Sequence, residues 1–314
     1  GMLSASDLIA TLPRSVRNRP LVVSMHENQA AYPSGPEVSR SNRDRDVHLA
    51  FTNLASLIAA DRVVWNSTWN LESFIEGMSA ILAHAPEPVD EAWADALRDR
   101  SIVIPPPIEF PEVEAAAILR NTPAARYADS GEREPGVVLV AWPHRWEHDK
   151  GCEELLELAD RAAEQESRGG PAIRWVVLGH RPPQPPAAME TFLQRHRERI
   201  VHAGESSRAD YLAWLAASDW VLSTARHEFF GLAVAEALIA GCLPWLPSRL
   251  AYPELVPEDG LNLTPWSPPT AEAAVDLRRR IRAGLEQARA EVAVAAVESV
   301  LTAEIERFAS QTDR

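Results

Sequence analysis

Cysteine is scarce in this sequence. Cys152 and Cys242 are the only two, they lie far apart, and they form no Cys-x-x-Cys pair. Such a chain has neither a disulfide framework nor a cysteine-rich zinc site, and sparse cysteine is typical of proteins that fold in a reducing cytosol.

Long apolar runs are also missing. The most apolar stretch, residues 233–246, is interrupted by Gly241 and Pro244 and is too short to span a bilayer. The N-terminus has no basic segment followed by an apolar core, as a secretory signal would have, and Gly1 before Met2 is typical of a tag remnant. The sequence therefore predicts a soluble, cytoplasmic protein that does not bind membranes.

Positive charge is in deficit. Lys and Arg number 31 against 45 Asp and Glu, so the formal net charge is −14 and the isoelectric point is near 5.1. This balance argues against a protein that coats nucleic acid through bulk charge, although it leaves room for local basic patches. The hydrophobic share of 46% and the charged share of 24% are those of a globular protein. A length of 314 residues suggests about two domains.

Short apolar runs alternate with helical patterns in two successive series. The first series predicts strands at 20–24, 62–67 and 101–104, and the second at 137–141, 174–178, 200–202, 220–223 and 243–246. Strict alternation of buried strands and amphipathic helices predicts parallel, doubly wound sheets, with functional loops at the carboxyl ends of the strands. The fold class is therefore α/β.

Composition suggests where the domains end. We expect a short N-terminal domain over 1–108, a linker rich in Pro, Ala and charge over 109–136, a C-terminal domain over 137–270, and a helical tail over 271–314. About 105 residues are few for a doubly wound domain of roughly 100 to 150.

Two glutamates flank the start of one predicted helix. Glu228 lies in the loop after a buried strand, and Glu236 lies one to two turns into the helix that Gly231 opens. A helix N-terminus suits a phosphate, whereas carboxylates beside it would repel one and would rather accept hydrogen bonds from hydroxyls. A nucleotide sugar presents both groups. A pair of surface carboxylates on a core helix would look the same in sequence.

The loop after the first strand of the second series carries Arg145 and Lys150. An arginine fork and a lysine point charge could together neutralise a leaving diphosphate, or they could simply be two solvated cations. The same loop contains His144-Arg-Trp-Glu-His148, the H-x-x-E-H string of some zinc peptidases. That chemistry requires a helix, but Pro143 and the preceding strand make this segment a loop, so we expect no metal site.

Polar side chains also follow the strands of the first series. His26 lies in a His-Glu-Asn-Gln loop that is unlike a protein core, and Asn53, Asn66 and Ser67 are weaker candidates of the same kind. Basic residues cluster nearby and could contact RNA phosphates, although acidic neighbours make a solvated loop an equal alternative. These residues are Arg14, Arg17, Arg19, Arg40, Arg43 and Arg45.

The spacing of Glu228 and Glu236, with Arg145 and Lys150 upstream, resembles the signature of glycosyltransferase family 4. More narrowly, the segments 25–29, 32–33, 51–53, 60–62, 66–67, 142–146 and 226–231 look like those of the tRNA-queuosine α-mannosyltransferase group. The resemblance covers about residues 20–256. It implies a GT-B fold, in which two Rossmann-like doubly wound domains face a cleft, with the first domain truncated at its N-terminus.

The resemblance also implies roles for residues of the C-terminal domain, which would bind the nucleotide sugar. Arg145 and Lys150 would hold the diphosphate of GDP-mannose, Glu228 would contact the mannose hydroxyls, and Glu236 would bind the ribose. The further donor-binding residues would be Gly179, Phe230, Gly231 and Glu254. No metal or other cofactor would be obligatory.

The N-terminal domain would take the acceptor. His26 would lie beside the transferred sugar, with Asn28, Asn53, Asn66 and Ser67 on the acceptor side. The enzyme would be a retaining glycosyltransferase that transfers mannose to queuosine in tRNA. Two alternatives stay open: a family 4 hexosyltransferase with another donor and a small-molecule or polysaccharide acceptor, and a non-catalytic module that binds a nucleotide sugar or tRNA. An open sheet edge left by a missing first strand could be covered by a second copy of the chain.

Overall fold

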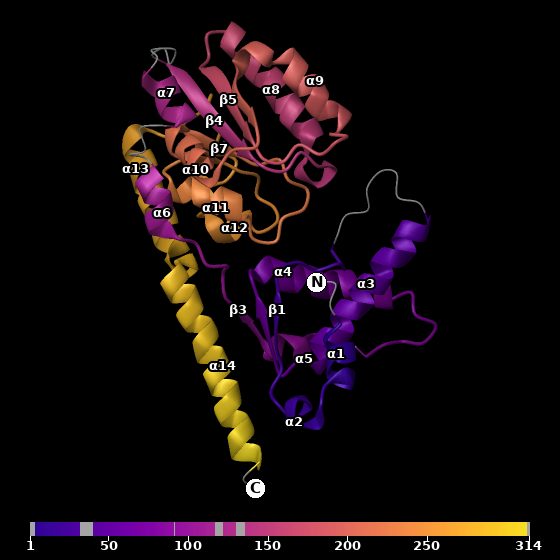
Figure 1. Cartoon of the computed structure of the whole chain (residues 1–314). Coiled ribbons are helices and arrows are strands. Elements are labelled where there is room, and N and C mark those ends of the chain that lie inside the picture. The colour runs from indigo at the N-terminus through magenta and orange to yellow at the C-terminus, as the bar shows by residue number, and fades with distance from the viewer. Residues whose placement is uncertain (1–3, 32–39, 91, 117–121, 130–135, 313–314) are drawn as a thin grey trace. The chain divides into compact units, whose positions relative to one another are not determined.

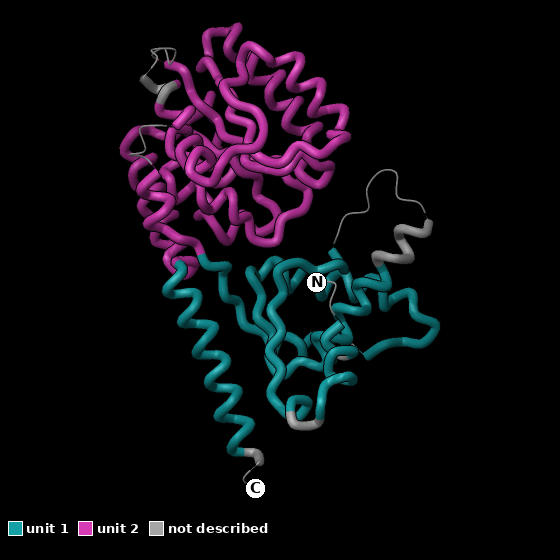
Figure 2. Tube along the Cα trace, in the orientation of Figure 1, with its two compact units in different colours: residues 1–107, 290–314 teal, residues 108–289 magenta. Residues whose placement is uncertain are grey.

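The computed structural model describes residues 4–31, 40–90, 92–116, 122–129 and 136–312. It divides into two compact units, which Figure 2 shows in different colours. Unit 1 comprises Gly1–Pro107 and Ala290–Arg314, and unit 2 comprises Ile108–Arg289. Each unit has its own parallel sheet, so the α/β class and the two predicted sheets are confirmed.

Unit 1 is built on a three-stranded sheet of order β1-β2-β3. All three strands are parallel, which requires a helical crossover between consecutive strands. Its elements are α1 (Ala5–Thr11), α2 (Arg14–Arg17), β1 (Val22–Met25), α3 (Arg40–Ala59), β2 (Arg62–Trp65), α4 (Thr68–Leu82), α5 (Ala92–Asp99), β3 (Ser101–Val103) and α14 (Ala290–Thr312).

The central strand β2 is buried on both faces. Successive side chains of a strand point to opposite faces, so Val63 and Trp65 enter one core while Val64 faces another. The first core includes buried residues of α3, α4 and α5. In the second, Val64 and Ile104 cluster with Ala293 of α14. The C-terminal helix α14 therefore covers a sheet face of unit 1.

A buried carboxylate also ties α14 to the sheet. Glu304 is 3% exposed, and its Oε1 accepts a hydrogen bond of 2.7 Å from Nε of Arg62 at the start of β2. Arg307, one turn further along α14, places Nη2 at 2.7 Å from Glu304 Oε2. Two cations thus compensate the one buried charge.

Unit 2 is larger and begins with two short helices. Its elements are α6 (Phe110–Ala115), α7 (Pro123–Asp129), β4 (Val137–Pro143), η2 (His148–Lys150), α8 (Cys152–Ser167), β5 (Ala172–Leu178), α9 (Ala187–Arg195), η3 (Arg197–Arg199), β6 (Ile200–Gly204), α10 (Arg208–Ala217), β7 (Trp220–Leu222), α11 (Leu232–Ile239), β8 (Leu243–Trp245), α12 (Tyr252–Leu255), η4 (Glu258–Gly260), α13 (Ala271–Leu285) and η5 (Glu286–Ala288).

The sheet of unit 2 has the order β6-β5-β4-β7-β8, with every strand parallel. The chain starts in the middle, builds outward through β5 and β6, and then crosses back to β7 and β8. Figure 1 shows the consequence: α8 and α9 lie on one face of the sheet, and α10 and α11 lie on the other. The order reverses between β4 and β7, so the crevice at their carboxyl ends is the expected ligand position.

The compact units divide the chain differently from the expected boundaries. The expected linker 109–136 contains α6 and α7, which pack into the core of unit 2 through Phe110, Val113 and Ala124. The expected tail is split, because α13 belongs to unit 2 and α14 to unit 1. The sequence misses this because α6 and α7 are too short to show a clear helical period, and a helix pattern does not say which core it covers.

The structure also describes the two cysteines and the apolar character of the helices. Both cysteines are buried free thiols, and burial raises the pKa of each to about 12, so they are protonated at neutral pH. Among the residues that the structure describes, no helix combines the length and the apolar character needed to cross a membrane.

We predict that the buried Glu304 carboxylate depends on its two arginines. The double change Arg62→Ala and Arg307→Ala leaves this charge without a cation, and the free energy of unfolding should fall by about 3 to 5 kcal/mol. Glu304→Leu leaves two arginines whose side chains are 37% and 47% exposed, and it should destabilise the protein by less than half as much. Urea denaturation followed by circular dichroism measures both. Equal losses would contradict the explanation.

Candidate functional site

The loops that follow β4 and β7 meet at the point where the strand order of unit 2 reverses. Val140 pairs with Trp220 and Ala141 with Val221, so the two strands run side by side to their carboxyl ends. The loop after β4 leads through η2 into α8, and the loop after β7 leads into α11. The predicted residues Arg145, Lys150, Glu228 and Gly231 lie in these two loops.

Lys150 joins the two loops. Its side chain is 11% exposed, and its Nζ donates a hydrogen bond of 2.9 Å to the carbonyl oxygen of His227. The same nitrogen lies 3.1 Å from Asp149 Oδ2 and 3.6 Å from Glu228 Oε2. The structure thus brings Lys150 and Glu228 together, at the end of η2 and in the β7 loop.

Lys150 is the only lysine of the chain, and the other 30 of the 31 basic residues are arginines. An ammonium is compact and donates in three directions, whereas a guanidinium is a planar fork. The three partners of Nζ are a neighbouring side chain, a backbone carbonyl and a carboxylate of the second loop, which suits the ammonium. The count of lysines is a signal in the sequence that could have marked this position as special.

The backbone around Lys150 also makes close contacts with the loop after β7. Gly151 has φ of 70°, and a Cβ at this position would lie 2.0 Å from the carbonyl oxygen of Thr224. Only glycine allows this approach. Thr224 Oγ1 donates to the Lys150 carbonyl at 2.8 Å, and the Asp149 carbonyl accepts from the Arg226 amide at 2.8 Å. The two loops therefore form one rigid corner.

The helix α11 begins at this corner. Gly231 is its N-cap and has φ of 90°, a left-handed conformation that favours glycine. Phe230 before it is buried and belongs to the core of unit 2. Glu228 is close to the glycine, since a Cβ at position 231 would lie 3.6 Å from Glu228 Cγ. The free amides of the first helical turn favour an anion here.

Arg145 is placed differently from Lys150. Its side chain is 58% exposed, and Nη1 lies 3.4 Å from Glu147 Oε1. Within the described parts of the chain it forms no ion pair with Glu228 or Glu236. The guanidinium is thus on the surface of the β4 loop, and Trp146 beside it is buried. Such an arginine can turn toward an anionic ligand without breaking a buried contact.

Glu236 does not reach the Lys150 corner. It is 6% exposed on α11, and its Oε1 lies 2.7 Å from Nη2 of Arg208, the first residue of α10. The hydroxyl of Tyr211 also hydrogen-bonds to this carboxylate. Sequence reasoning misses both partners. A glutamate within the apolar helix Leu232–Ile239 could have signalled that a cation must lie nearby.

Two further predicted donor residues lie at other strand or helix ends. Gly179 follows β5 with φ of 118°, and a Cβ there would lie 2.1 Å from the His144 carbonyl oxygen. Gly179 therefore lets the end of β5 approach the β4 loop. Glu254 is an exposed residue of α12, the short helix in which Tyr252 is buried.

Two buried imidazoles flank Lys150. His144 is 4% exposed and His227 is 7% exposed. Burial and, to a smaller extent, the Lys150 charge lower the pKa of His144 to about 3 and that of His227 to about 4. Both rings are therefore neutral at physiological pH, so Lys150 is the cation among these three side chains. The sequence shows the histidines but not their burial.

Among the candidates of unit 1, His26 is exposed and the others are largely buried. His26 follows β1, and its carbonyl oxygen accepts a hydrogen bond of 2.8 Å from Asn66 Nδ2. Asn28 is fully buried and donates to the backbone carbonyl of Asn70 at 3.0 Å. Asn53 Oδ1 accepts from the Gln29 amide, and Ser67 caps α4 through the Asn70 amide.

These amides and hydroxyls hold the loop that presents His26. Asn70, which no sequence pattern singles out, donates to the Met25 carbonyl at 3.1 Å and to Asn66 Oδ1 at 2.8 Å. Arg17 and Arg19 are exposed in the same unit. The segment 32–33 of the family resemblance, and the side chains of Arg14, Arg40, Arg43 and Arg45, lie outside the described residues.

The H-x-x-E-H string does not form a compact set of ligands. His144 is buried, whereas His148 is exposed with its Nδ1 at 3.7 Å from Glu153 Oε1. In the parts of the chain that are described, no three His, Cys, Asp or Glu residues lie close enough to hold a metal ion.

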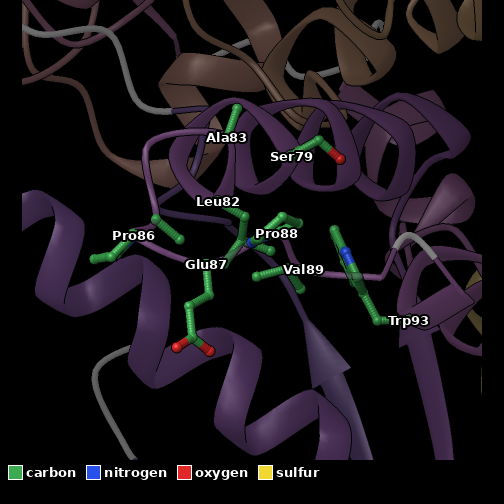
Figure 3. A pocket seen from close by; sticks show the side chains of 9 residues that line it. Ser79, Leu82, Ala83, Pro86, Glu87, Pro88, Val89 and Trp93 are labelled. Carbon is green, nitrogen blue, oxygen red and sulfur yellow. The ribbon is translucent and has the colours of Figure 1, made fainter.

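A separate hollow of about 380 Å³ lies in unit 1 (Figure 3). Its walls come from the end of α4, the segment 85–89 and Trp93 of α5. It contains none of the predicted site residues.

We predict that the two neutral imidazoles make stability depend on pH. Their ordinary pKa of 6.5 applies in the unfolded chain, so between that value and about 3 to 4 the unfolded state binds more protons. Stability should therefore fall as the pH falls below about 6.5, by up to about 1.4 kcal/mol per pH unit for each ring.

His144→Phe tests this prediction, because the phenyl ring can keep the edge contact with Trp142 and cannot titrate. Urea denaturation at several pH values from 7 to 4.5 should show a slope in the variant that is smaller by up to about 1.4 kcal/mol per pH unit. An unchanged slope would show that His144 is not kept neutral by burial.

Comparisons with known proteins agree with this architecture. Residues 1–108 match the family described as tRNA-queuosine alpha-mannosyltransferase N-terminal. The chain is 30% identical over 263 residues to the tRNA-queuosine alpha-mannosyltransferase of Drosophila melanogaster. This match covers 84% of this chain and 66% of that protein. It is 26% identical over 157 residues to the GDP-mannose:cellobiosyl-diphosphopolyprenol alpha-mannosyltransferase of Xanthomonas campestris, covering 48% of this chain and 40% of that one.

The fold is similar to that of solved glycosyltransferases. A UDP-forming α,α-trehalose-phosphate synthase from Burkholderia xenovorans superposes with a TM-score of 0.67 at 14% identity, covering 97% of this chain and 72% of that chain. The chain spans 66% and 40% of the length of the two curated relatives. The resemblance inferred from the motifs is thus confirmed: the chain is a relative of the tRNA-queuosine alpha-mannosyltransferases and has the GT-B fold of glycosyltransferases.

Proposed function

We propose that the chain is a retaining family 4 glycosyltransferase that transfers mannose from GDP-mannose to queuosine in tRNA. The observation that carries the proposal is the corner where Lys150 contacts Glu228 and the His227 carbonyl, beside the start of α11. A buried ammonium and free helix amides suit a diphosphate, and a partly exposed carboxylate suits sugar hydroxyls. The names of the Drosophila and Xanthomonas relatives supply the sugar, the donor and the acceptor.

Each residue then has a defined task. In transfer, the bond between the anomeric carbon and the diphosphate breaks, the acceptor oxygen bonds to the same face of the sugar, and the proton of the acceptor hydroxyl passes to the departing diphosphate. Negative charge grows on the departing diphosphate, where Lys150, Arg145 and the α11 amides would stabilise it. Glu228, whose side chain is 22% exposed, would accept hydrogen bonds from mannose hydroxyls. We assign His26 to the acceptor side, with Asn28, Asn53, Asn66 and Ser67 holding its loop.

The first experiment measures donor binding by calorimetry with GDP-mannose, GDP and UDP-glucose. We expect selective binding of the guanine nucleotides. Arg145→Ala should weaken that binding about 10- to 100-fold, because each hydrogen bond between charged groups contributes roughly 1.5 to 3 kcal/mol. Arg279→Ala is the control, since Arg279 is 72% exposed on α13 and pairs only with Asp276 among the described residues.

Other outcomes separate the alternatives. Binding of uridine nucleotides would indicate another donor, and binding of none would contradict the donor site. Donor binding without hydrolysis or transfer would indicate a non-catalytic module.

The second experiment tests the acceptor with radiolabelled GDP-mannose. We expect label in tRNA prepared from cells that make queuosine and none in tRNA from cells that lack it. Because RNA phosphates release counterions on binding, tRNA affinity should fall by at least about tenfold between 50 and 200 mM salt. Equal labelling of both tRNA samples, or transfer only to small molecules without salt dependence, would refute the queuosine assignment.

A further inference from the structure

Glu236 is a buried carboxylate in an apolar helix. It is 6% exposed, and its neighbours Val234, Ala235 and Ala237 are fully buried. An isolated charge in such surroundings is strongly unfavourable, so a cation must accompany it. The cation is Arg208, whose Nη2 lies 2.7 Å from Glu236 Oε1.

Arg208 stands at the functional edge of the sheet. It is the first residue of α10, which follows the carboxyl end of β6 after a loop of three residues. Helices α10 and α11 lie on the same face of the sheet, and both start at its carboxyl edge (Figure 1). The pair of Arg208 and Glu236 therefore lies near the first turns of two neighbouring helices.

The guanidinium of Arg208 has hydrogen-bond donors that its protein partners do not use. Its Nε and Nη2 contact Glu112 Oε2 of α6 at 3.3 and 3.0 Å, and Nη2 also contacts Glu236. A guanidinium has five N–H groups, and within the described residues Nη1 has no partner. The side chain is 46% exposed, so this end of the fork faces solvent. Tyr211 lies beneath the fork, with its ring centre 5.7 Å from Arg208 Cζ.

The carboxylate of Glu236 is not used up by these contacts. Two oxygens offer about four acceptor sites, and Arg208 and Tyr211 occupy two of them. Both partners come from α10, so they approach from one side and orient the group. The remaining acceptor sites of the carboxylate can accept hydrogen bonds from two vicinal hydroxyls, such as those of a ribose.

We propose that Arg208 is a positioning residue of the nucleotide subsite, which holds the Glu236 carboxylate oriented to accept hydrogen bonds from the ribose hydroxyls of the donor. This inference rests on the proposed nucleotide-sugar donor. It assigns a role in the site to α10. It also distinguishes Arg208 from Arg145 and Lys150, because Arg208 acts through a carboxylate rather than on the diphosphate.

A purely structural role is the alternative. Arg208 links α6, α10 and α11, so its loss would lower stability whether or not a nucleotide binds. The two roles differ in one measurable ratio, the affinity for GDP divided by the affinity for 2′,3′-dideoxy-GDP. A helix-to-helix link affects both ligands equally, whereas a misplaced Glu236 affects only the ligand with ribose hydroxyls.

The experiment measures this ratio by calorimetry and the melting temperature of each variant. In the unchanged protein we expect GDP to bind at least about tenfold more tightly than the dideoxy analogue. Arg208→Gln should bring the ratio close to one. Arg208→Lys, which keeps the charge without the fork, should give an intermediate ratio and keeps the test possible if the first variant does not fold.

Glu112→Gln is the matched control, because it removes the other carboxylate partner of Arg208 and should leave the ratio unchanged. If Arg208→Gln or Arg208→Lys keeps the affinity ratio of the unchanged protein and only lowers the melting temperature, the inference is overturned. Arg208 would then be a purely structural link between helices. A ratio of one in the unchanged protein, with selective guanine-nucleotide binding intact, would overturn it while the proposed function stands. Failure of all guanine nucleotides to bind would overturn both.

Discussion

The ammonium group of Lys150 is the interaction on which the candidate site depends. It is almost buried, it joins the loop after β4 to the loop after β7, and it approaches the acidic groups of Asp149 and Glu228. Burial and, to a smaller extent, the Lys150 charge lower the pKa of His144 and of His227 and keep both rings neutral. The chain otherwise uses only arginine as its strong base, so the one lysine occupies the position that a planar fork would fit poorly.

A net charge of −14 is compatible with an anion site because charge is balanced locally. Exposed charges further apart than about 8 to 10 Å are largely screened at physiological salt, so the charges close to a site determine its electrostatic potential. Around the carboxyl edge of unit 2, several carboxylates have a cation within ion-pair distance. These pairs include Glu147 with Arg145, Asp149 and Glu228 with Lys150, Glu153 with Arg226, Glu154 with Arg249, and Glu236 with Arg208.

The pattern of the sequence was a good guide to the elements and a poor guide to where they pack. Strands β6, β7 and β8 begin where the pattern predicts, at Ile200, Trp220 and Leu243, because short apolar runs and their flanking loops are local features. The division of the tail was not predictable, since α13 and α14 show similar helical patterns. Burial of Glu304 against Arg62, 242 positions away, helps to place α14 in unit 1.

The sequence by itself determined the alternation of strands and helices, the two sheets, and the residue types at the strand ends that point to a nucleotide sugar. These are properties of neighbouring residues, which periodicity and composition record. Only the tertiary structure decided which of those residues meet. Lys150 and Glu228 share a corner, Glu236 turns to Arg208 on another helix, and Asn28, Asn53 and Ser67 hold a loop. Such pairings arise from strand order and helix packing, and they join residues whose separation in the chain carries no local signal.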